Sequence, residues 1–225
     1  MENQEKCLIK NLYRQPQRSL AYSLLEQFDY PWQALAHITE FILQLGKTLS
    51  TEEYNKIGED IWIAKNAKVA DSASISGPCI ICPNAEIRHC AYVRGSAIIG
   101  EGAVVGNSTE LKNCILFDGV QVPHYNYVGD SILGYKAHMG AGSITSNVKG
   151  DKSLVTVCMG KERIPTDRKK CGAMLGDYVE VGCNSVLNPG TVVGVGTQIY
   201  PLSLVRGYID ENCIFKSQDN IVKKR

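Results

Sequence analysis

A fixed six-residue spacing of apolar side chains is the feature that most restricts how this sequence can fold. Eleven apolar residues follow one another at steps of six from Ile57 to Phe117, and small residues such as Ala85 and Ala91 recur four places after them. Neither the 3.6-residue period of a helix nor the two-residue period of a strand produces this pattern. A period of six instead predicts a mainly β protein, a parallel β-helix in which three units make one triangular coil.

The spacing divides the chain into three parts. We expect a β-helix of about seven coils over residues 57–206, an N-terminal helical segment over residues 1–56, and a C-terminal tail over residues 207–225. The period lapses over residues 148–171, which carry seven lysines and arginines against three acids. This stretch is therefore predicted to be a basic loop that is extruded from the coil.

The N-terminal segment shows a different period. Apolar residues recur at steps of three and four from Trp32 to Leu45, with Pro31 suited to a first helical turn and Gly46 to a helix end. This pattern predicts a helical hairpin that packs on the main domain or on a partner subunit. A separate functional domain is the less favoured interpretation, because so short a segment holds no core of its own.

The count of six slips within residues 118–147, where Pro123 and His124 stand. Beyond the slip the apolar row resumes at Tyr127 and Leu133, four places out of phase. Histidine changes its charge near neutral pH, which suits a general base. A surface or structural histidine is the alternative, so the residues alone leave the role of His124 open.

Two cations stand 18 residues apart in the unbroken part of the repeat, Arg94 and Lys112. In a triangular coil this spacing places them at the same corner of adjacent coils, about 4.8 Å apart. Stacked cations repel each other, and a phosphate bound between them would remove the repulsion. The spacing is also compatible with side chains that both point into solvent, or with a Glu110 carboxylate that pairs with Lys112.

Composition excludes several classes of protein. The net charge is +1, no stretch reaches 18 apolar residues, and the mixed-charge N-terminus does not resemble a signal peptide. Neither nucleic acid nor a membrane is therefore an expected partner. The nine scattered cysteines suggest reduced thiols and a cytoplasmic location. Four zinc-type ligands lie close together within the repeat, namely Cys79, Cys82, His89 and Cys90. A structural zinc site requires a compact knuckle and these residues are part of the repeat, so no metal is expected.

The region after the slip resembles a known family of enzymes. Its most specific motifs are H-x-x-Y-x-G-D, which begins at His124, and G-A-G-[ST]-I-T-x-N, which ends at Asn147. They resemble the acetyltransferase domain of the bifunctional glucosamine-1-phosphate acetyltransferase/N-acetylglucosamine-1-phosphate uridyltransferase. The basic stretch TDRKKCGAMLGD resembles archaeal sugar-1-phosphate nucleotidylyltransferase/acetyltransferases. The resemblance covers about residues 57–206 and, more loosely, the FDYPW segment.

This resemblance implies a left-handed β-helix, a homotrimer with sites between neighbouring prisms, and acetyl transfer from acetyl-CoA to the amine of a hexosamine 1-phosphate. It implies that His124 is the general base that takes a proton from the sugar amine. The substrate-binding residues that it implies are Arg94, Lys112, Glu110, Tyr127, Asn147 and His138. On the coenzyme side it implies Ala141, through its main-chain amide, together with Lys152 and Cys183.

The sequence also departs from the family pattern. His138 stands where the bacterial enzymes have an asparagine, Cys183 replaces a serine, and residues 149–155 are about one residue shorter than the family's loop. Residues 1–56 contain no glycine-rich nucleotide loop, so no nucleotidylyltransferase activity is expected. The γ-carbonic anhydrases share such a prism, but their histidine spacing is missing here. The alternative to an enzyme is a non-catalytic sugar-phosphate-binding, regulatory or assembly module on the same scaffold.

Overall fold

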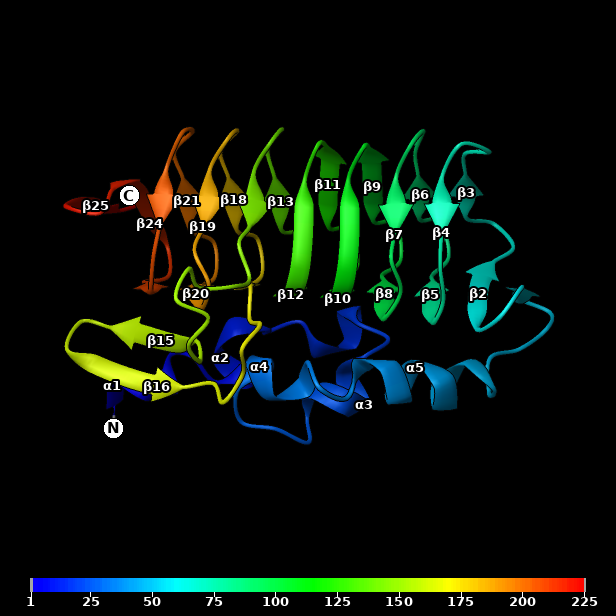
Figure 1. Ribbon diagram of the computed structural model, residues 1–225, viewed down its shortest axis with the longest axis horizontal. Coiled ribbons are helices and arrows are strands. Elements are labelled where there is room, and N and C mark those ends of the chain that lie inside the picture. The colour runs from blue at the N-terminus through cyan, green and yellow to red at the C-terminus, as the bar shows by residue number, and fades with distance from the viewer. Residues whose placement is uncertain (1, 225) are drawn as a thin grey trace.

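The chain winds into a parallel β-helix in the computed structural model, which describes residues 2–224 (Figure 1). In Figure 1 the strands nearer the viewer run downward and those behind run upward, while the chain advances from right to left. This sense of winding is left-handed. The predicted fold class, a left-handed parallel β-helix with an N-terminal helical segment, is confirmed.

Three faces of paired strands form the prism. The strands of the first face are β2 (Ile61–Ala64), β5 (Cys79–Ile81), β8 (Ala97–Ile99), the second halves of β10 (Glu110–Leu116) and β12 (Tyr127–Leu133), β17 (Ala173–Leu175), β20 (Thr191–Val193) and β23 (Tyr208–Ile209). Those of the second face are β3 (Lys68–Val69), β6 (Glu86–Ile87), β9 (Val104–Asn107), β11 (Gln121–His124), β13 (His138–Met139), β18 (Glu180–Val181), β21 (Gln198–Ile199) and β24 (Cys213–Ser217). Those of the third face are β4 (Ser74–Ile75), β7 (Tyr92–Val93), the first halves of β10 and β12, β14 (Ile144–Thr145), β19 (Val186–Leu187) and β22 (Leu204–Val205). The coil is longer than the seven turns expected, because β23 and β24 extend it beyond residue 206.

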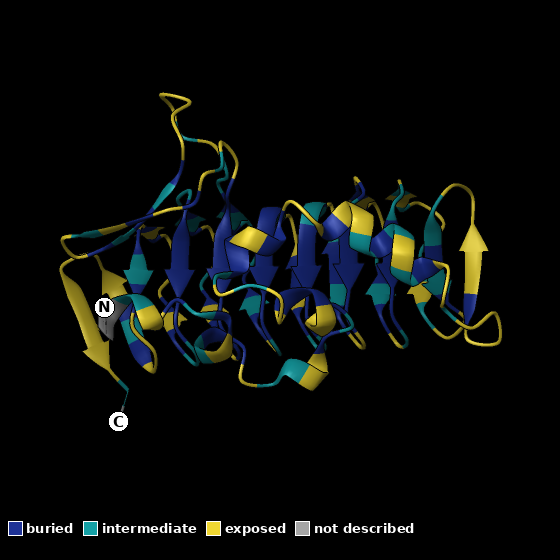
Figure 2. Ribbon diagram, turned by 90° about the horizontal axis from the view of Figure 1, so that it is seen from below, coloured by how far each residue is buried: buried dark blue, intermediate teal, exposed yellow. Residues whose placement is uncertain are grey.

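Rows of inward side chains form the core. On the first face the register aligns Ile81, Ile99, Leu116 and Leu133, all of them fully buried. Each coil has three faces and takes about 18 residues, so an inward side chain recurs every six residues and lies above its equivalent in the preceding coil. Figure 2 shows the strands of the prism buried and the tips of its loops exposed.

The predicted phase change of four places is correct at Leu133 and Met139, which are both fully buried, but it does not occur in a single slip. The row instead shortens by one residue twice, once within β10 and once within β12. Each of these strands runs for seven residues through the corner between the third and first faces. Leu116 and Val128 consequently point inward, whereas a constant spacing predicts Phe117 and Tyr127. Ile57, the first predicted core residue, is 51% exposed because it lies in β1 (Tyr54–Ile57), outside the parallel coil.

A second apolar row lies on the outside of the first face, where the N-terminal segment covers it (Figure 1). Its members are aligned by the strand register and at most 5% exposed: Trp62, Ile80, Ile98, Ile115, Ile132, Met174 and Val192. The covering elements are α1 (Glu2–Glu5), α2 (Ile9–Leu12), η1 (Pro16–Arg18), α3 (Tyr22–Leu25), α4 (Pro31–Ala34) and α5 (Ile38–Gly46). The segment is thus a string of short helices on its own prism and not the helical hairpin that was expected. Pro31 does open α4 and Gly46 does end α5, as predicted.

Residues 148–171 leave the coil and form an antiparallel hairpin of β15 (Thr156–Met159) and β16 (Glu162–Pro165). The hairpin packs beside β20 and β23, where Met159 Sδ lies 3.4 Å from Cys7 Sγ. At the two ends of the coil the strand direction reverses. β1 pairs antiparallel with β2, and β25 (Asn220–Lys223) pairs antiparallel with β24. None of the helices within residues 2–224 has the length and apolar character needed to cross a bilayer.

Close contact between coils gives a stability prediction. A Cβ atom added to Gly106 in β9 would lie 1.6 Å from the carbonyl oxygen of Pro123 in the next coil. We expect Gly106→Ala to cost about 3 kcal/mol or more, and so to lower Tm by about 6–12 °C, because two backbone segments must move apart. Gly150→Ala is the matched control, since a Cβ there meets nothing within 4 Å. Equal Tm values for the two variants in a thermal melt would contradict the packing described.

Candidate functional site

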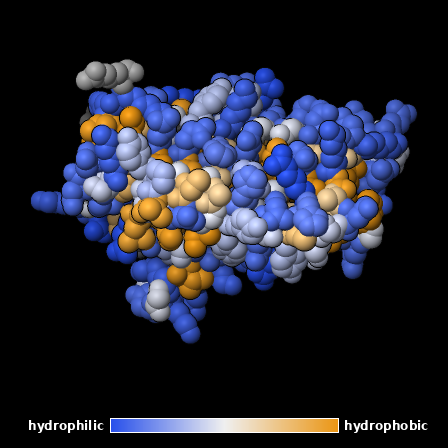
Figure 3. Space-filling model, turned by 90° about the horizontal axis from the view of Figure 1, so that it is seen from above, coloured by the Kyte–Doolittle hydropathy of each residue, from blue (hydrophilic) through white to orange (hydrophobic). Residues whose placement is uncertain are grey.

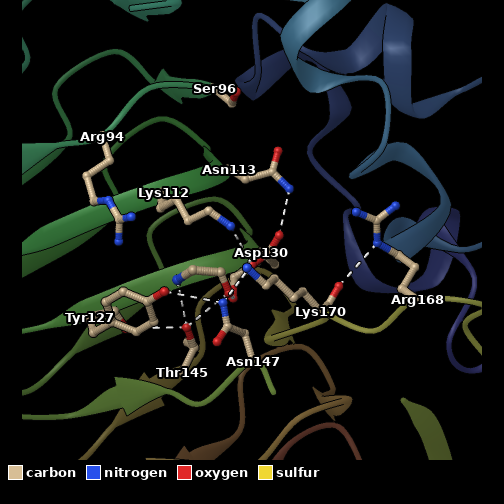
Figure 4. A network of polar contacts seen from close by, with 12 residues as sticks. Arg94, Ser96, Lys112, Asn113, Tyr127, Asp130, Thr145, Asn147, Arg168 and Lys170 are labelled. Atoms are coloured by element: carbon tan, nitrogen blue, oxygen red, sulfur yellow. Dashed lines mark hydrogen bonds and ion pairs between the residues drawn. The ribbon is translucent and has the colours of Figure 1, made fainter. Parts of the chain in front are cut away.

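The stacked cations lie on the third face in the register expected from their 18-residue spacing. The Arg94 N–H donates to the Leu111 carbonyl at 2.8 Å, which places Arg94 and Lys112 on adjacent coils. Arg94 Nη1 lies 2.7 Å from Glu110 Oε1, and Lys112 Nζ lies 3.3 Å from Asp130 Oδ2 (Figure 4). Glu110 therefore pairs with Arg94 and not with Lys112. Each cation has one carboxylate partner and keeps further donors for an anion.

Tyr127 and Asn147 lie beside these cations. The Asn147 Nδ2 donates to the Tyr127 hydroxyl at 3.2 Å. A Cβ on Gly129 would lie 2.4 Å from this hydroxyl, so only glycine lets the ring fold over that position. Burial raises the pKa of Tyr127, the nearby carboxylates Asp130 and Glu110 raise it further, and the Asn147 hydrogen bond lowers it. The hydroxyl remains protonated at neutral pH and can donate to a ligand.

A ladder of polar side chains supports the cluster from the corner behind it. Asn113, Asp130 and Asn147 occupy three successive coils at this corner. Asp130 is 2% exposed and accepts hydrogen bonds from Asn113 Nδ2 at 2.9 Å and from Asn147 Nδ2 at 2.6 Å. With the Lys112 contact, this buried carboxylate joins side chains from both neighbouring coils (Figure 4).

His124 ends β11 at the edge where the second face meets the third. Its ring is exposed and has no hydrogen-bond partner among residues 4–224. In the next coil the Gly142 N–H donates to the His124 carbonyl at 3.0 Å, whereas the Ala141 N–H has no acceptor within the part of the chain described. Cys183 follows in the same column, since the Asn184 N–H donates to the Ala141 carbonyl at 2.8 Å. An imidazole and an available main-chain donor thus lie at one corner.

Within one chain the site residues form two groups. The cation cluster comprises Arg94, Glu110, Lys112, Tyr127 and Asn147, and the His124 corner comprises His124, Ala141 and Cys183. His124 ends the second face before the turn at Tyr125, whereas the position of Lys112 is paired with Gly129, which comes just before the turn at Asp130 into the first face. The two groups therefore lie at opposite edges of the third face.

A groove continues the row that holds Lys112 and Gly129. Its volume is about 810 Å³, and the hairpin residues Lys149 and Arg163 line one side of it. Ser146, Asn188 and Arg206 line the other side. The strand register aligns these three residues with Gly129, so that all four occupy the same position on successive coils of the third face. The groove thus has three cations and opens directly beside the cation cluster.

The remaining predicted residues lie outside both groups. His138 is on the second face, with its Nδ1 2.8 Å from Glu180 Oε2 on the next coil. Lys152 is exposed in the loop beside the groove, where its N–H donates to the Lys149 carbonyl at 2.9 Å. The zinc-type residues are not gathered, since Cys79 is buried and His89 Nδ1 contacts Ser72 Oγ at 2.8 Å. No cluster of three or more metal-type side chains occurs in the described part of the chain.

The sequence reasoning missed Asp130 and Arg206. Asp130 is the last residue of the H-x-x-Y-x-G-D motif, but no role was given to it. A signal was present, because Asn113 and Asn147 stand 17 residues on either side of Asp130. In a coil that has lost one residue, 17 is the spacing of stacked positions, as in the pairing of Lys112 with Gly129. Arg206 had no such signal, because the hairpin interrupts the count before it.

Comparisons with known proteins agree with this description. The family described as "GMPPB C-terminal domain" matches residues 75–197, more than half of the chain. A bifunctional sugar-1-phosphate nucleotidylyltransferase/acetyltransferase of Sulfurisphaera tokodaii is 32% identical over 194 residues, 77% of this chain and 48% of that protein. The bifunctional protein GlmU of Methanococcus aeolicus is 30% identical over 202 residues, 87% of this chain and 48% of that protein. The chain therefore spans about half the length of these relatives.

Among solved structures, the acetyltransferase domain of PglB from Neisseria gonorrhoeae, in complex with acetyl coenzyme A, aligns with 73% of this chain and 57% of its own. The sequence identity is 14% and the TM-score 0.34. The family resemblance inferred from the motifs is confirmed by the relatives above. The chain belongs to the GMPPB C-terminal domain family.

Proposed function

We propose that this protein transfers the acetyl group of acetyl-CoA to the amine of a hexosamine 1-phosphate of the glucosamine 1-phosphate type. The observation that carries the proposal is the stacking of Arg94 and Lys112 on adjacent coils, beside the hydroxyl of Tyr127 and the amide of Asn147. A guanidinium and an ammonium bind a phosphate through charge-assisted hydrogen bonds. The Sulfurisphaera relative is named as a sugar-1-phosphate nucleotidylyltransferase/acetyltransferase, which supports the same substrate class.

The His124 corner supplies the groups for the transfer. The sugar nitrogen attacks the thioester carbonyl carbon, and His124 takes a proton from that nitrogen as the C–N bond forms. The carbonyl oxygen becomes an oxyanion, which the available Ala141 N–H stabilises. The C–S bond then breaks and the coenzyme leaves as a thiolate that takes up a proton. The products are the N-acetylated sugar phosphate and coenzyme A.

The groove beside the hairpin suits the coenzyme. Lys149, Arg163 and Arg206 offer three cations for its phosphates. Next to the groove, the outward row of the third face is apolar, with Ile144 and Val186 partly buried and Leu204 63% exposed. An apolar strip beside a cationic groove matches an acyl-pantetheine chain that ends in phosphates. Lys152, at the rim, is a further candidate contact.

A homotrimer is part of this proposal, because the cation cluster and the His124 corner lie at opposite edges of one face. A neighbouring prism can bring its His124 corner to the cation cluster of the first. Exposed apolar side chains favour such packing, notably Leu202, which is 79% exposed, and Tyr125, which is 63% exposed. Figure 3, which looks onto the edge where the second face meets the third, shows apolar patches interrupted by polar side chains. Flat, partly polar faces are typical of subunit contacts in closed oligomers.

The direct test is release of the coenzyme thiol when the protein is mixed with acetyl-CoA and glucosamine 1-phosphate or galactosamine 1-phosphate. Turnover of either amino sugar, with none for glucose 1-phosphate, is the expected result. Binding of an amino-sugar phosphate by calorimetry without any turnover would favour the non-catalytic binding module instead. Absence of both binding and turnover would overturn the proposal.

Thiol labelling tests the coenzyme side separately. Burial raises the pKa of Cys79 to about 12, and the pKa of Cys171 likewise to about 12, so these thiols stay protonated and shielded. Cys90 and Cys183 are exposed, and a thiol reagent at about pH 8 should label both in the native protein. We expect acetyl-CoA to slow labelling of Cys183 and to leave Cys90 unaffected, as measured by mass spectrometry. Equal protection of both, or of neither, would contradict the placement of the coenzyme.

A further inference from the structure

We infer that Asp130 is a positioning residue, whose buried carboxylate turns the Asn147 amide so that its oxygen faces the acceptor amine. The inference rests on the proposed function for the identity of the acceptor. It assigns a role to a side chain that lies behind the cation cluster and does not itself reach the ligand. Asp130 lies between the amides of Asn113 and Asn147 and the ammonium of Lys112.

The contacts of Asp130 come from the coils on either side of it. From the preceding coil, Asn113 Nδ2 donates to Oδ1 at 2.9 Å and Lys112 Nζ lies 3.3 Å from Oδ2. From the following coil, Asn147 Nδ2 donates to Oδ2 at 2.6 Å. The Asp130 side chain is 3% exposed, so water cannot replace a lost partner at low cost.

A carboxylate accepts hydrogen bonds and does not donate them, and this property fixes the direction of the whole network. The Asn147 side chain must turn its NH2 group toward Asp130, which leaves its Oδ1 on the opposite side (Figure 4). The same NH2 group donates to the Tyr127 hydroxyl at 3.2 Å, so the hydroxyl proton points elsewhere and is available to a ligand. One buried charge thus sets an acceptor at Asn147 and a donor at Tyr127.

This arrangement matches the two ends of an amino-sugar phosphate. The donors Tyr127, Lys112 and Arg94 suit phosphate oxygens, and the acceptor Oδ1 of Asn147 suits an ammonium or amine. An asparagine at position 130 could donate as well as accept, so the Asn147 amide would be free to turn over. Its NH2 group would then face the sugar amine, and two donors would oppose each other.

The test measures the preference for an amine over a hydroxyl in the same sugar phosphate. Calorimetry gives Kd for glucosamine 1-phosphate and for glucose 1-phosphate with the wild-type protein and with Asp130→Asn. We expect the wild type to prefer the amino sugar and the variant to lose this preference by about tenfold, since a hydrogen bond to a charged group is lost. Steady-state kinetics should show a raised KM for the amino-sugar phosphate and an unchanged KM for acetyl-CoA.

Asp177→Asn is the matched control. Asp177 is a second fully buried aspartate, which accepts main-chain N–H groups of Arg14, Gln15 and Tyr135 away from the cation cluster. The control should lower Tm while both KM values and the amine preference stay at wild-type levels. A preference that is lost equally in both variants would mean that Asp130 is merely structural, and would overturn the inference.

The remaining outcomes separate this inference from the proposed function. A wild type that binds neither sugar phosphate removes the proposed function and, with it, the inference. A wild type that binds both sugars equally, or an Asp130→Asn variant that keeps the preference, overturns the inference and leaves the function standing. Should Asp130→Asn fail to fold, Asn147→Leu removes the same acceptor oxygen, and retention of the preference in that variant would overturn the inference.

Discussion

Replacing His124 with alanine is expected to lower kcat for acetyl transfer by about 10²–10⁴-fold, the usual contribution of a positioned general base. The imidazole is exposed and has no partner in the described chain, and it lies beside the available Ala141 N–H. Its loss removes the proton acceptor without disturbing the core. Affinity for the sugar phosphate, measured by calorimetry, should change little, because the cation cluster is intact.

His89→Ala is the matched control for this prediction. His89 lies in the same corner column two coils away, as the hydrogen bond from Asn107 Nδ2 to its carbonyl at 3.0 Å shows, and it is also exposed. This variant should retain wild-type turnover. If His124→Ala were as active as His89→Ala, another group would have to take the proton, although the enzyme class could stand.

Two inactive variants should restore activity when they assemble together. If one copy supplies the cation cluster and its neighbour supplies the His124 corner, a mixture of His124→Ala and Lys112→Ala chains contains intact sites. Random assembly of equal amounts leaves about one quarter of the sites intact, because each site draws one group from each of two chains. Coexpression or mixed refolding, followed by the thiol-release assay, should therefore recover about one quarter of wild-type turnover.

A mixture of Arg94→Ala with Lys112→Ala is the control, because both residues belong to the cation cluster of one chain. No site in that mixture is complete, so no recovery is expected. Activity that stays absent in the His124→Ala and Lys112→Ala mixture would show that the two groups act within one chain. The geometry would then require the hairpin or the corner to move.

The fold was predictable because its period is long, regular and unlike that of any other element. Eleven apolar residues at steps of six indicated stacked coils directly. The errors arose where the repeat changed by one residue. β10 and β12 continue straight through a corner, and a shortened turn displaces every later position by one, so Phe117 and Tyr127 were placed inside the coil. A pattern counted at a constant step cannot locate such a change without the strand register.

The site was predictable in part for the same reason. Arg94 and Lys112 lie before the shortened turn, and their stacking followed from the spacing alone. Asp130 lies after it, and its neighbours at 17 residues fell outside the count. The outer apolar row of the first face was also missed, since members such as Ile80 and Ile98 were obscured by their apolar neighbours in the interior row. Which face the N-terminal helices cover depends on contacts between distant segments.

The reversed strands at the two ends of the coil hinder the end-to-end addition of further copies of the protein. A stack of identical parallel coils presents at each end a row of unpaired backbone groups, to which another copy could add and so build a fibre. Here β1 and β25 run antiparallel to the coils beneath them, so an added parallel coil would meet strands of opposite direction. β25 also ends at Lys223 and is exposed along its length. The reversed strands thus block the addition of further copies at both ends and leave the sides of the prism for the homotrimer contacts proposed above.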